Sequence, residues 1–549
     1  MRILFFLFLL FLIFLLQDSP LFALENFPDQ TPFLPIQATQ NSSNSLTIKT
    51  PGISTTPVIS ASNLNPNYLN PNYLNPDNLN LNNKISLQSA IYLALRHNTD
   101  LLTSLNNRQL ERFDLLTAQQ AFEPQASITN SLNYSKTEST GSPNYFTKSA
   151  SVGPQVTWTL PLGTQVQTSV NYQPSGQSGT SGELENNNYE SSQLGYSITV
   201  TQPLLQGFGV DVNEVDLDNA YDQQTIDDLN LETTVETTVI NVANAYYAVV
   251  SAEQAYQISE RSLQDAQKEL ARRKARLEAG QIPATDVTQA SIDLMTQQQS
   301  LGAADQALSS AKADFLNTLG LPSNTSFEVD PNPTISQEPT DLIQSDQEAL
   351  KNNINLKVEA LESKQDERNI LKSKDSRKWT LDLVASRSRS SSSTTYEDIN
   401  NPNTSNTSDN SSISLNLTIP LNQVTLDQNE LSSAISLENQ QITEAQQKRS
   451  LINNVNAAVN NLNSQWFQYQ MAQEKLTLSQ QSFNAARIEY QYGKLDAFAF
   501  QQQQESYINS QQSVVDSEIN YLKQVMSYQQ LVGTLLTHWH INIEAPAHV

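Results

Sequence analysis

The chain has 549 residues, 38% of them hydrophobic, and a mean hydropathy of −0.45. This length allows several core-sized units, but the hydropathy excludes a membrane body built from many apolar helices. The 31 Lys and Arg residues against 56 Asp and Glu give a formal charge of −25, which argues against a nucleic-acid partner. The absence of Cys excludes disulfides, thiolate metal sites and Cys nucleophiles.

The N-terminal segment 1–83 is typical of an export signal followed by a leader. Arg2 precedes an unbroken apolar run from Ile3 to Leu16, which has the length of a signal-peptide core and is too short to span a bilayer. We therefore expect residues 1–23 to be a signal that is cleaved near Ala23. Residues 24–83 are rich in Asn, Ser and Pro, and positions 65–79 contain a five-residue repeat three times. This composition predicts a disordered leader, and a binding role for the repeat stays open.

Further along, two segments in each half of the chain alternate apolar and polar residues with the period of a β-strand. A third alternating pair, 152–160 and 166–172, predicts an extra hairpin that turns at residues 161–163. The polar tracts 141–149, 173–192 and 390–412 are expected to be long loops. The apolar residues of the first four segments are Ile128, Leu132 and Tyr134; Leu194, Tyr196, Ile198 and Val200; Leu381 and Leu383; and Ile413, Leu415, Leu417 and Ile419.

These strands are about the length that crosses a bilayer. So few strands cannot close a barrel, and an open sheet edge is not tolerated in lipid. Several copies of the chain must then contribute strands together.

After the strands of each half, the apolar period changes from two to seven. The two heptad ladders of the first half have counterparts in the second half at a constant offset of 213 in the numbering. Gly280 and Gly320 lie forty residues apart, as do Gly493 and Gly533, again at the offset of 213. The two halves are therefore an internal duplication. The ladders are 235–277 and 287–315 in the first half, and 455–490 and 500–528 in the second.

The stretch from about 212 to 279 lacks Pro and Gly and predicts a rod about 100 Å long, which must pack lengthwise against others. Gly280 and Gly493 fit helix ends, and Pro283 fits the first turn of a returning helix. Each half is therefore expected to contain a long antiparallel helical hairpin. The seam three residues after the bulky ladder is small or polar, with Ala245, Ala252, Ser259 and Ala266, which favours close packing of neighbouring helices.

In this combination, the signal, the strand pair, the long hairpin and the second copy resemble the TolC-type outer membrane factor family over residues 84–543. Residues 280–290, Gly-Gln-Ile-Pro-Ala-Thr-Asp-Val-Thr-Gln-Ala, resemble that family's first periplasmic turn, and 201–205, Thr-Gln-Pro-Leu-Leu, its strand-to-helix junction. The resemblance implies a mixed membrane protein, a trimeric outer-membrane β-barrel continued by a long antiparallel α-helical coiled-coil barrel. Each chain would contribute four strands, or six if the extra hairpin joins the wall.

The implied domains are a signal at 1–23, a leader at 24–83, a first repeat at 84–320, a linker at 321–345, a second repeat at 346–540 and a tail at 541–549. The implied function is the outer-membrane exit duct of a tripartite efflux pump or a type I secretion system, with the helical domain in the periplasm. Its partners would be two further copies of the chain, a periplasmic adaptor, an inner-membrane pump and outer-membrane lipid, with no cofactor.

By the same resemblance, the closed state is held at the hairpin tips by hydrogen bonds and charge pairs. Asp286 and Tyr490 occupy the matching positions. The family's Arg position is Leu495 here, which leaves the adjacent Lys494 as the basic gate residue. Asp286 is equally well explained as a helix-start carboxylate that faces the helix dipole.

The family's best-known members place two Asp residues around the constriction, and Ala499 and Gln502 stand at those positions. This replacement argues against strong cation selectivity. Nothing in the sequence identifies the transported substrate, because a wide polar duct passes drugs, metal ions and polypeptides alike.

Two other architectures share part of this pattern. A periplasmic coiled-coil adaptor also has heptad hairpins, but it predicts one hairpin and this chain has two; a simple porin would spend its length on strands. An enzyme is not expected, because the four His residues are scattered. His538 and His540 would need further ligands to hold a metal, so no metal site is predicted.

Overall fold

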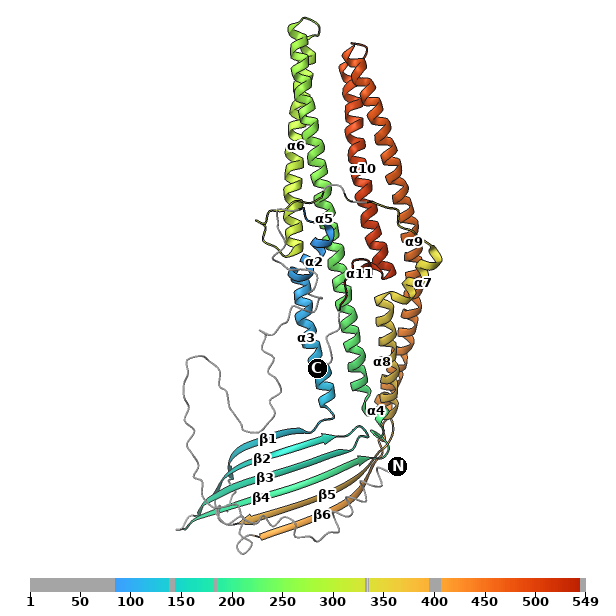
Figure 1. Ribbon diagram of the computed structural model, residues 1–549. Helices are drawn as coiled ribbons and strands as arrows, with labels where there is room; N and C mark the ends of the chain where they lie inside the picture. The colour runs from blue at the N-terminus through green and yellow to red at the C-terminus, as the bar shows by residue number, and fades with distance from the viewer. Residues whose placement is uncertain are drawn as a thin grey trace. The chain divides into compact units, whose positions relative to one another are not determined.

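In a computed structural model of the protein, residues 84–137, 144–181, 185–330, 333, 335–393 and 406–543 are described. The predicted signal, the leader with its repeat and positions 544–549 of the tail lie outside these residues. The described part consists of helices and one antiparallel sheet (Figure 1). In chain order, helices α2 and α3 precede strands β1 to β4, helices α4 to α8 follow, and strands β5 and β6 precede α9 to α11.

The sheet has six strands, and each strand pairs with the next along the chain. Strands β2 and β3 are the predicted extra hairpin, and they lie between β1 and β4, so this hairpin is part of the sheet itself. The strands are β1 (Gln125–Thr137), β2 (Asn144–Thr159), β3 (Gln165–Ser181), β4 (Glu185–Pro203), β5 (Thr380–Ser393) and β6 (Asn406–Thr418).

Several strands extend into tracts that the sequence predicts to be loops, so the loop prediction is wrong for those residues. Much of 141–149 belongs to β2, most of 173–192 belongs to β3 and β4, and parts of 390–412 belong to β5 and β6. The backbone ladder continues there although the apolar alternation has stopped; Ser175, for example, lies opposite Ser191. Strand pairing depends on backbone hydrogen bonds, which polar side chains do not prevent.

The sheet has one apolar and one polar face, because residues directly opposite each other in neighbouring antiparallel strands share a face. One row of the apolar face contains Trp158, Val166, Val200, Ala385 and Ile413. The adjacent row on the polar face contains Thr157, Gln167, Thr199, Ser386 and Ser412. On the polar face, hydroxyl pairs 2.7 to 2.8 Å apart link the strands, namely Ser131 with Ser151, Ser169 with Ser197, Ser175 with Ser191, and Ser386 with Ser412.

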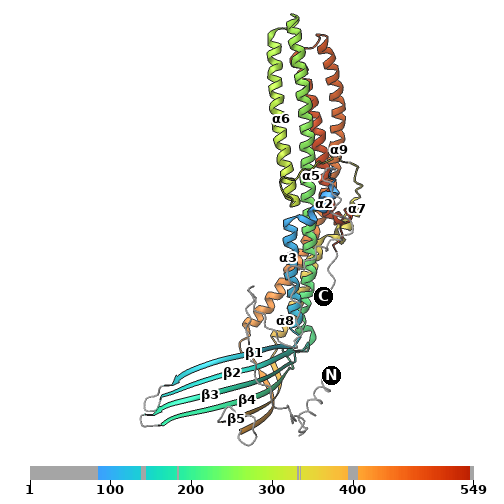
Figure 2. The ribbon, with the colours of Figure 1, turned by 60° about the vertical axis from the view of Figure 1, so that its left-hand side comes forward.

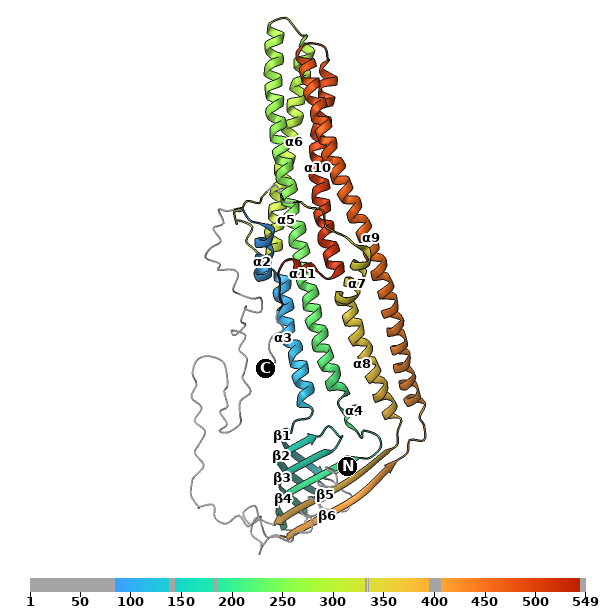
Figure 3. The ribbon, with the colours of Figure 1, turned by 45° about the vertical axis from the view of Figure 1, so that its right-hand side comes forward.

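Four long helices form two antiparallel hairpins, α5 with α6 and α9 with α10 (Figures 1 and 3). Helix α5 (Val215–Glu278) has 64 residues and α9 (Val424–Gln491) has 68, so each is about 100 Å long. Helices α6 (Ala284–Leu319) and α10 (Ala497–Val532) both have 36 residues, and their starts and ends keep the offset of 213 found in the sequence. Glu214 separates α5 from the short α4 (Val210–Asn213), so the rod begins three residues later than expected.

Shorter helices extend the two hairpins (Figure 2). Helices α2 (Leu87–His97) and α3 (Thr99–Gln120) pack on α5, while α7 (Leu342–Asn352) and α8 (Ile354–Ser376) pack on α9. The small α11 (Leu535–His538) follows α10. Asn98 and Asn353 cap α3 and α8, since each side chain accepts a hydrogen bond from a backbone N–H of the first helical turn.

The buried apolar core lies where these shorter helices meet the middle of the long ones. Heptad residues Val235, Val242 and Val249 are fully buried there, as are Val455 and Leu462 in the second half. Towards the hairpin turns the ladder residues become only half-buried, as Leu263, Leu270 and Leu476 illustrate.

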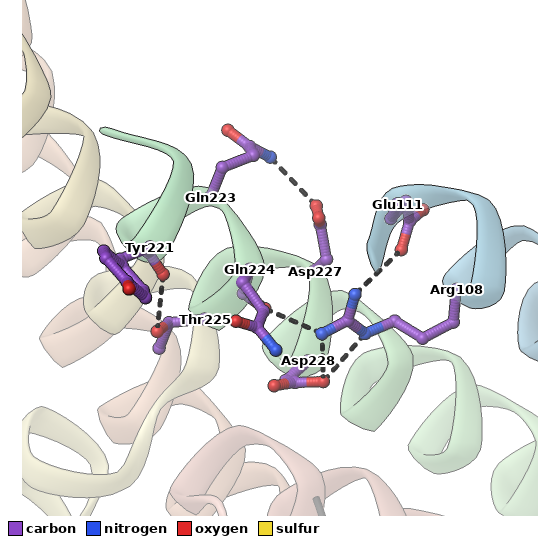
Figure 4. Close-up of polar contacts among 8 residues, drawn as sticks. All are labelled: Arg108, Glu111, Tyr221, Gln223, Gln224, Thr225, Asp227 and Asp228. Atoms are coloured by element: carbon purple, nitrogen blue, oxygen red, sulfur yellow. Dashed lines mark hydrogen bonds and ion pairs between the residues drawn. The ribbon is translucent and has the colours of Figure 1, made fainter. Parts of the chain in front are cut away.

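A buried arginine connects α3 to α5 (Figure 4). The Arg108 side chain is 4% exposed; its Nε donates to Asp228 Oδ1 over 2.8 Å and its Nη2 donates to the Gln224 carbonyl over 3.2 Å. Glu111 lies 3.8 Å from Nη1. Burial raises the pKa of both Glu111 and the nearby Asp227. The single cation thus holds a group of carboxylates together between the two helices.

Candidate functional site

The two hairpin turns have the same backbone geometry. At the first turn Gly280 has φ +67°, and the N–H of Gln281 donates to the Arg276 carbonyl over 2.8 Å. At the second, Gly493 has φ +74°, and the N–H of Lys494 donates to the Glu489 carbonyl over 2.9 Å. Each glycine therefore ends its helix in a left-handed conformation that satisfies the last carbonyl groups, as predicted from its position.

The returning helices start one residue later than the position of Pro283 suggests. Pro283 has extended backbone, with φ −76° and ψ 159°, and lies at the N-cap of α6 rather than in its first turn. Its counterpart in the second half is Asp496, whose carboxylate accepts a 2.8 Å hydrogen bond from the N–H of Ala499. The second turn is thus capped by a side chain, whereas the first relies on the fixed φ of proline.

Near these turns the side chain of Arg273, on α5, is at the centre of the polar contacts. Arg273 is 2% exposed, and its Nε donates to Glu269 Oε1 over 3.0 Å. Its Nη1 donates to the backbone carbonyl of Asp286 over 3.1 Å, which ties α5 to the first turn of α6. The guanidinium carbon lies 5.4 Å from the centre of the Tyr490 ring, a cation–π distance. One cation therefore connects both helices of the first hairpin to the second.

Tyr490 continues these contacts into α9 and α10. Burial is the main cause that raises the pKa of its phenol, and its hydroxyl hydrogen-bonds the Glu269 carboxylate. Its ring stacks on Phe500 at 4.9 Å, and Phe483 stacks on both Phe500 and Tyr507, at 5.7 and 5.3 Å. The corresponding first-hairpin residues are aliphatic, so only the second hairpin has an aromatic stack at these positions.

The structure brings two of the three predicted gate residues together, through a further residue. Tyr490 and the backbone of Asp286 both contact Arg273, while the Asp286 side chain is half-buried in the first turn of α6. Lys494 is exposed and follows the turn glycine. Of the predicted constriction residues, Ala499 is half-exposed and Gln502 is exposed, both on α10.

Sequence reasoning missed Arg273, although the sequence contains a signal for it. The small seam Ala245, Ala252, Ser259 and Ala266 continues, seven residues on, at Arg273. The counterpart at the offset of 213 is Ala486, which is also buried. An arginine at a seam position that otherwise holds small residues indicates that the helices do not pack closely there and that a charge is buried between them.

A family model for outer membrane efflux proteins matches residues 165–321 and 346–534, which is more than half of the chain. The chain belongs to the outer membrane efflux protein family. This family consists of efflux channels of the outer membrane and not of enzymes. A comparison with curated protein sequences finds no match.

Solved structures of outer-membrane channels share the fold of this outer membrane efflux protein. VceC, an outer membrane protein of Vibrio cholerae, has a TM-score of 0.61 at 12% identity, with 81% of this chain and 96% of VceC covered. The open-state MtrE outer membrane channel of Neisseria gonorrhoeae has a TM-score of 0.59 at 15% identity, covering 82% and 89%. CusC, studied for transmembrane channel formation, has a TM-score of 0.60 at 16% identity, covering 81% and 92%.

Two further features of this efflux protein concern membrane helices and metals. Among the helices that the structure describes, none has the length and hydrophobicity to cross a membrane. Across the described ranges no group of three or more His, Asp or Glu side chains is arranged to hold a metal ion. His538 ends α11, and its ring contacts Trp539 edge-on at 5.5 Å.

Proposed function

We propose that the chain is one subunit of a homotrimeric exit duct, which works with a periplasmic adaptor and an inner-membrane pump. Substrates pass from the helical part in the periplasm to the outside through the barrel. The duct is built from two tandem repeats, residues 84–320 and 346–540, which a linker joins. The gate lies at the hairpin turns around Gly280 and Gly493.

The observation that carries this proposal is the open six-stranded sheet with two different faces. Strands β1 and β6 are its edges, and every residue of both strands is exposed. An open edge is not tolerated in lipid, because its backbone N–H and C=O groups have no partner there. Three copies that pair β1 of one subunit with β6 of the next close the sheet, with the polar face towards the lumen and the apolar face towards lipid.

The equal spacing of the helical hairpins supports the two-repeat plan. The hairpin turns, the starts of α6 and α10 and the ends of these helices all share the offset of 213. The half-buried ladder residues near the turns leave apolar surface for the hairpins of neighbouring subunits. In this arrangement Arg273, Tyr490 and Asp286 hold the two hairpins of one subunit together at the closed end.

Reconstitution in planar bilayers tests the duct and its gate. The purified protein should migrate as a heat-resistant trimer. The Asp286→Ala/Tyr490→Phe variant should show a higher single-channel conductance, because it loses the hydroxyl that hydrogen-bonds Glu269 and the carboxylate in the first turn of α6. Unchanged conductance would contradict the gate assignment and leave the duct intact. A monomer without channel activity would contradict the duct itself.

A further inference from the structure

The basic residues of the sheet are confined to its apolar face. The six described strands contain four Lys or Arg residues, namely Lys136, Lys148, Arg387 and Arg389. The pairing register places all four on the face that carries Trp158, Val166 and Ile413. The polar face of these strands has none, although cations would be well solvated there. In a chain with a charge of −25, the placement of all four cations on the apolar face indicates a specific role for them.

Arg387 and Arg389 form a compact pair among these four. They lie two residues apart on β5, so their side chains leave the same face about 7 Å apart. Both are exposed, and Arg389 Nε lies 4.0 Å from Asp409 Oδ1 on β6, at the limit of an ion pair. Within the described residues no carboxylate pairs with Arg387. The pair therefore has more positive charge than its neighbours neutralise.

On the β4 side the neighbours of this pair on the same face are apolar or aromatic, whereas Ser411 and Asp409 lie opposite it on β6. Tyr196 lies opposite Arg389, and Ile198 lies opposite Arg387, both on β4. On β6, Ile413 and Leu415 continue the apolar face in the direction of the helices, and they are 58% and 62% exposed. Two guanidinium groups thus lie at the end of an exposed apolar strip.

A cation on the lipid side of a barrel costs about 2–4 kcal/mol at the middle of the bilayer and little near its surface. Arg387 and Arg389 lie in the half of β5 that is remote from α8, and both side chains are long enough to reach the headgroup level. Guanidinium groups bind phosphate through two parallel N–H donors. Neither water nor hydrocarbon offers these donors an anionic partner of the same geometry.

Building on the proposed function, we propose that Arg387 and Arg389 bind the phosphate of an outer-membrane lipid, whose acyl chains cover Ile198, Ile413 and Leu415. Tyr196 lies beside the headgroup, as aromatic residues do at the interface. The ligand class is a phosphate-bearing lipid, because charge and apolar surface adjoin in the same site. A free phosphate ion would use the two arginines and leave the apolar strip unused.

Native mass spectrometry of the full-length protein in detergent tests this site. The protein is incubated with phosphatidylglycerol, with a diacylglycerol that lacks phosphate, or with inorganic phosphate. The wild type should retain phosphatidylglycerol and neither of the others, and Arg387→Gln/Arg389→Gln should lower retention by about tenfold. The control Arg449→Gln/Lys475→Gln removes two exposed charges from α9 and should retain lipid like the wild type.

The conservative variant keeps the test decisive if the glutamine variant folds poorly. Arg387→Lys/Arg389→Lys keeps the charge but loses the paired donors. Its retention of phosphatidylglycerol should therefore fall between that of the wild type and that of the glutamine variant. Equal retention in all variants, or equal retention of the diacylglycerol, would overturn the lipid site. Retention of inorganic phosphate alone would replace it by a simple anion site. Conductance of the same samples separates these outcomes from a failure of the channel.

Discussion

At the residue scale, Arg273 shows how the contacts of a buried charge compensate for its desolvation. Removing a guanidinium from water is costly unless its donors are paired. Glu269, the Asp286 carbonyl and the Tyr490 ring supply this compensation from three different helices. Loss of the guanidinium therefore disturbs the ends of both hairpins at once.

We expect Arg273→Gln to increase channel conductance and to lower the melting temperature by several degrees, since Glu269 is left half-satisfied in a largely buried position. The adjacent Arg272 is a matched control, because it also pairs with Glu269, at 3.1 Å, but is 51% exposed. Arg272→Gln should leave conductance and melting temperature nearly unchanged. Similar effects of both variants would show that Arg273 has no special role.

Two glycines with similar backbone angles predict different costs of substitution. Gly280 has φ +67° with open space where a Cβ would lie, whereas Gly320 has φ +72° and a Cβ there would lie 2.0 Å from the His97 carbonyl oxygen. Gly280→Ala should cost about 1 kcal/mol for the left-handed backbone alone. Gly320→Ala should cost several kcal/mol, because α2 must move away. Thermal unfolding of the two variants measures this difference, and equal melting temperatures would contradict it.

At the element scale, α5 is the helix that joins the two halves, and Glu236 lies at this junction. Glu236 is 6% exposed on α5, hydrogen-bonded to Gln530 of α10 and close to Glu232 and to Lys357 of α8. Burial, reinforced by the charge of Glu232, raises its pKa from 4.5 to about 7. Relative to the unfolded chain, folding therefore favours the protonated form.

This shift predicts a pH dependence of the stability of the helical region. The unfolded chain releases the Glu236 proton near pH 4.5 and the folded protein near pH 7, so the free energy of unfolding should fall as pH rises between these values. Glu236→Gln mimics the protonated acid and should raise the melting temperature at pH 8 but not at pH 4. Melting curves at both pH values test this, and an equal effect at both would refute it.

At the scale of the whole molecule, the sheet is the part that a single chain leaves incomplete. Its interior strands β2 to β5 are paired on both sides, but β1 and β6 have one neighbour each. Polar side chains alternate with exposed apolar ones along β1 and along residues 413–418 of β6, including Leu132 at 90% and Leu415 at 62% exposed. An edge of this kind favours pairing with another strand.

Cysteine cross-linking checks the proposed closure, and the absence of native Cys removes background. A cysteine at Ser131 of β1, combined in turn with one at Ser408, Asn410 or Ser412 of β6, should give intermolecular disulfides in at least one combination. All four positions lie on the polar face. A cysteine at Ser131 with one at Ser169 of the interior strand β3 should give none. The absence of cross-links in every β1–β6 combination would contradict the trimeric barrel.

The sequence by itself determined the elements whose signals are local. Heptad spacing, a glycine after the last helical residue and a period of two are set by the geometry of a single helix or strand. The two hairpin turns at Gly280 and Gly493 and the extra hairpin β2–β3 were therefore predictable. The family was predictable as well, because the resemblance to it depends on the order of these same elements.

Only the tertiary structure decided which side chains meet. A heptad position indicates that a residue faces a partner but does not identify the partner. The contact between Arg273 in the first half and Tyr490 in the second could therefore not be predicted from the sequence. Strand ends were also misjudged, since backbone pairing continues through polar residues. The pairing of β4 with β5, which the whole first helical hairpin separates along the chain, likewise placed Arg387 beside Ile198. Such contacts are set by the packing of distant elements, which no local pattern encodes.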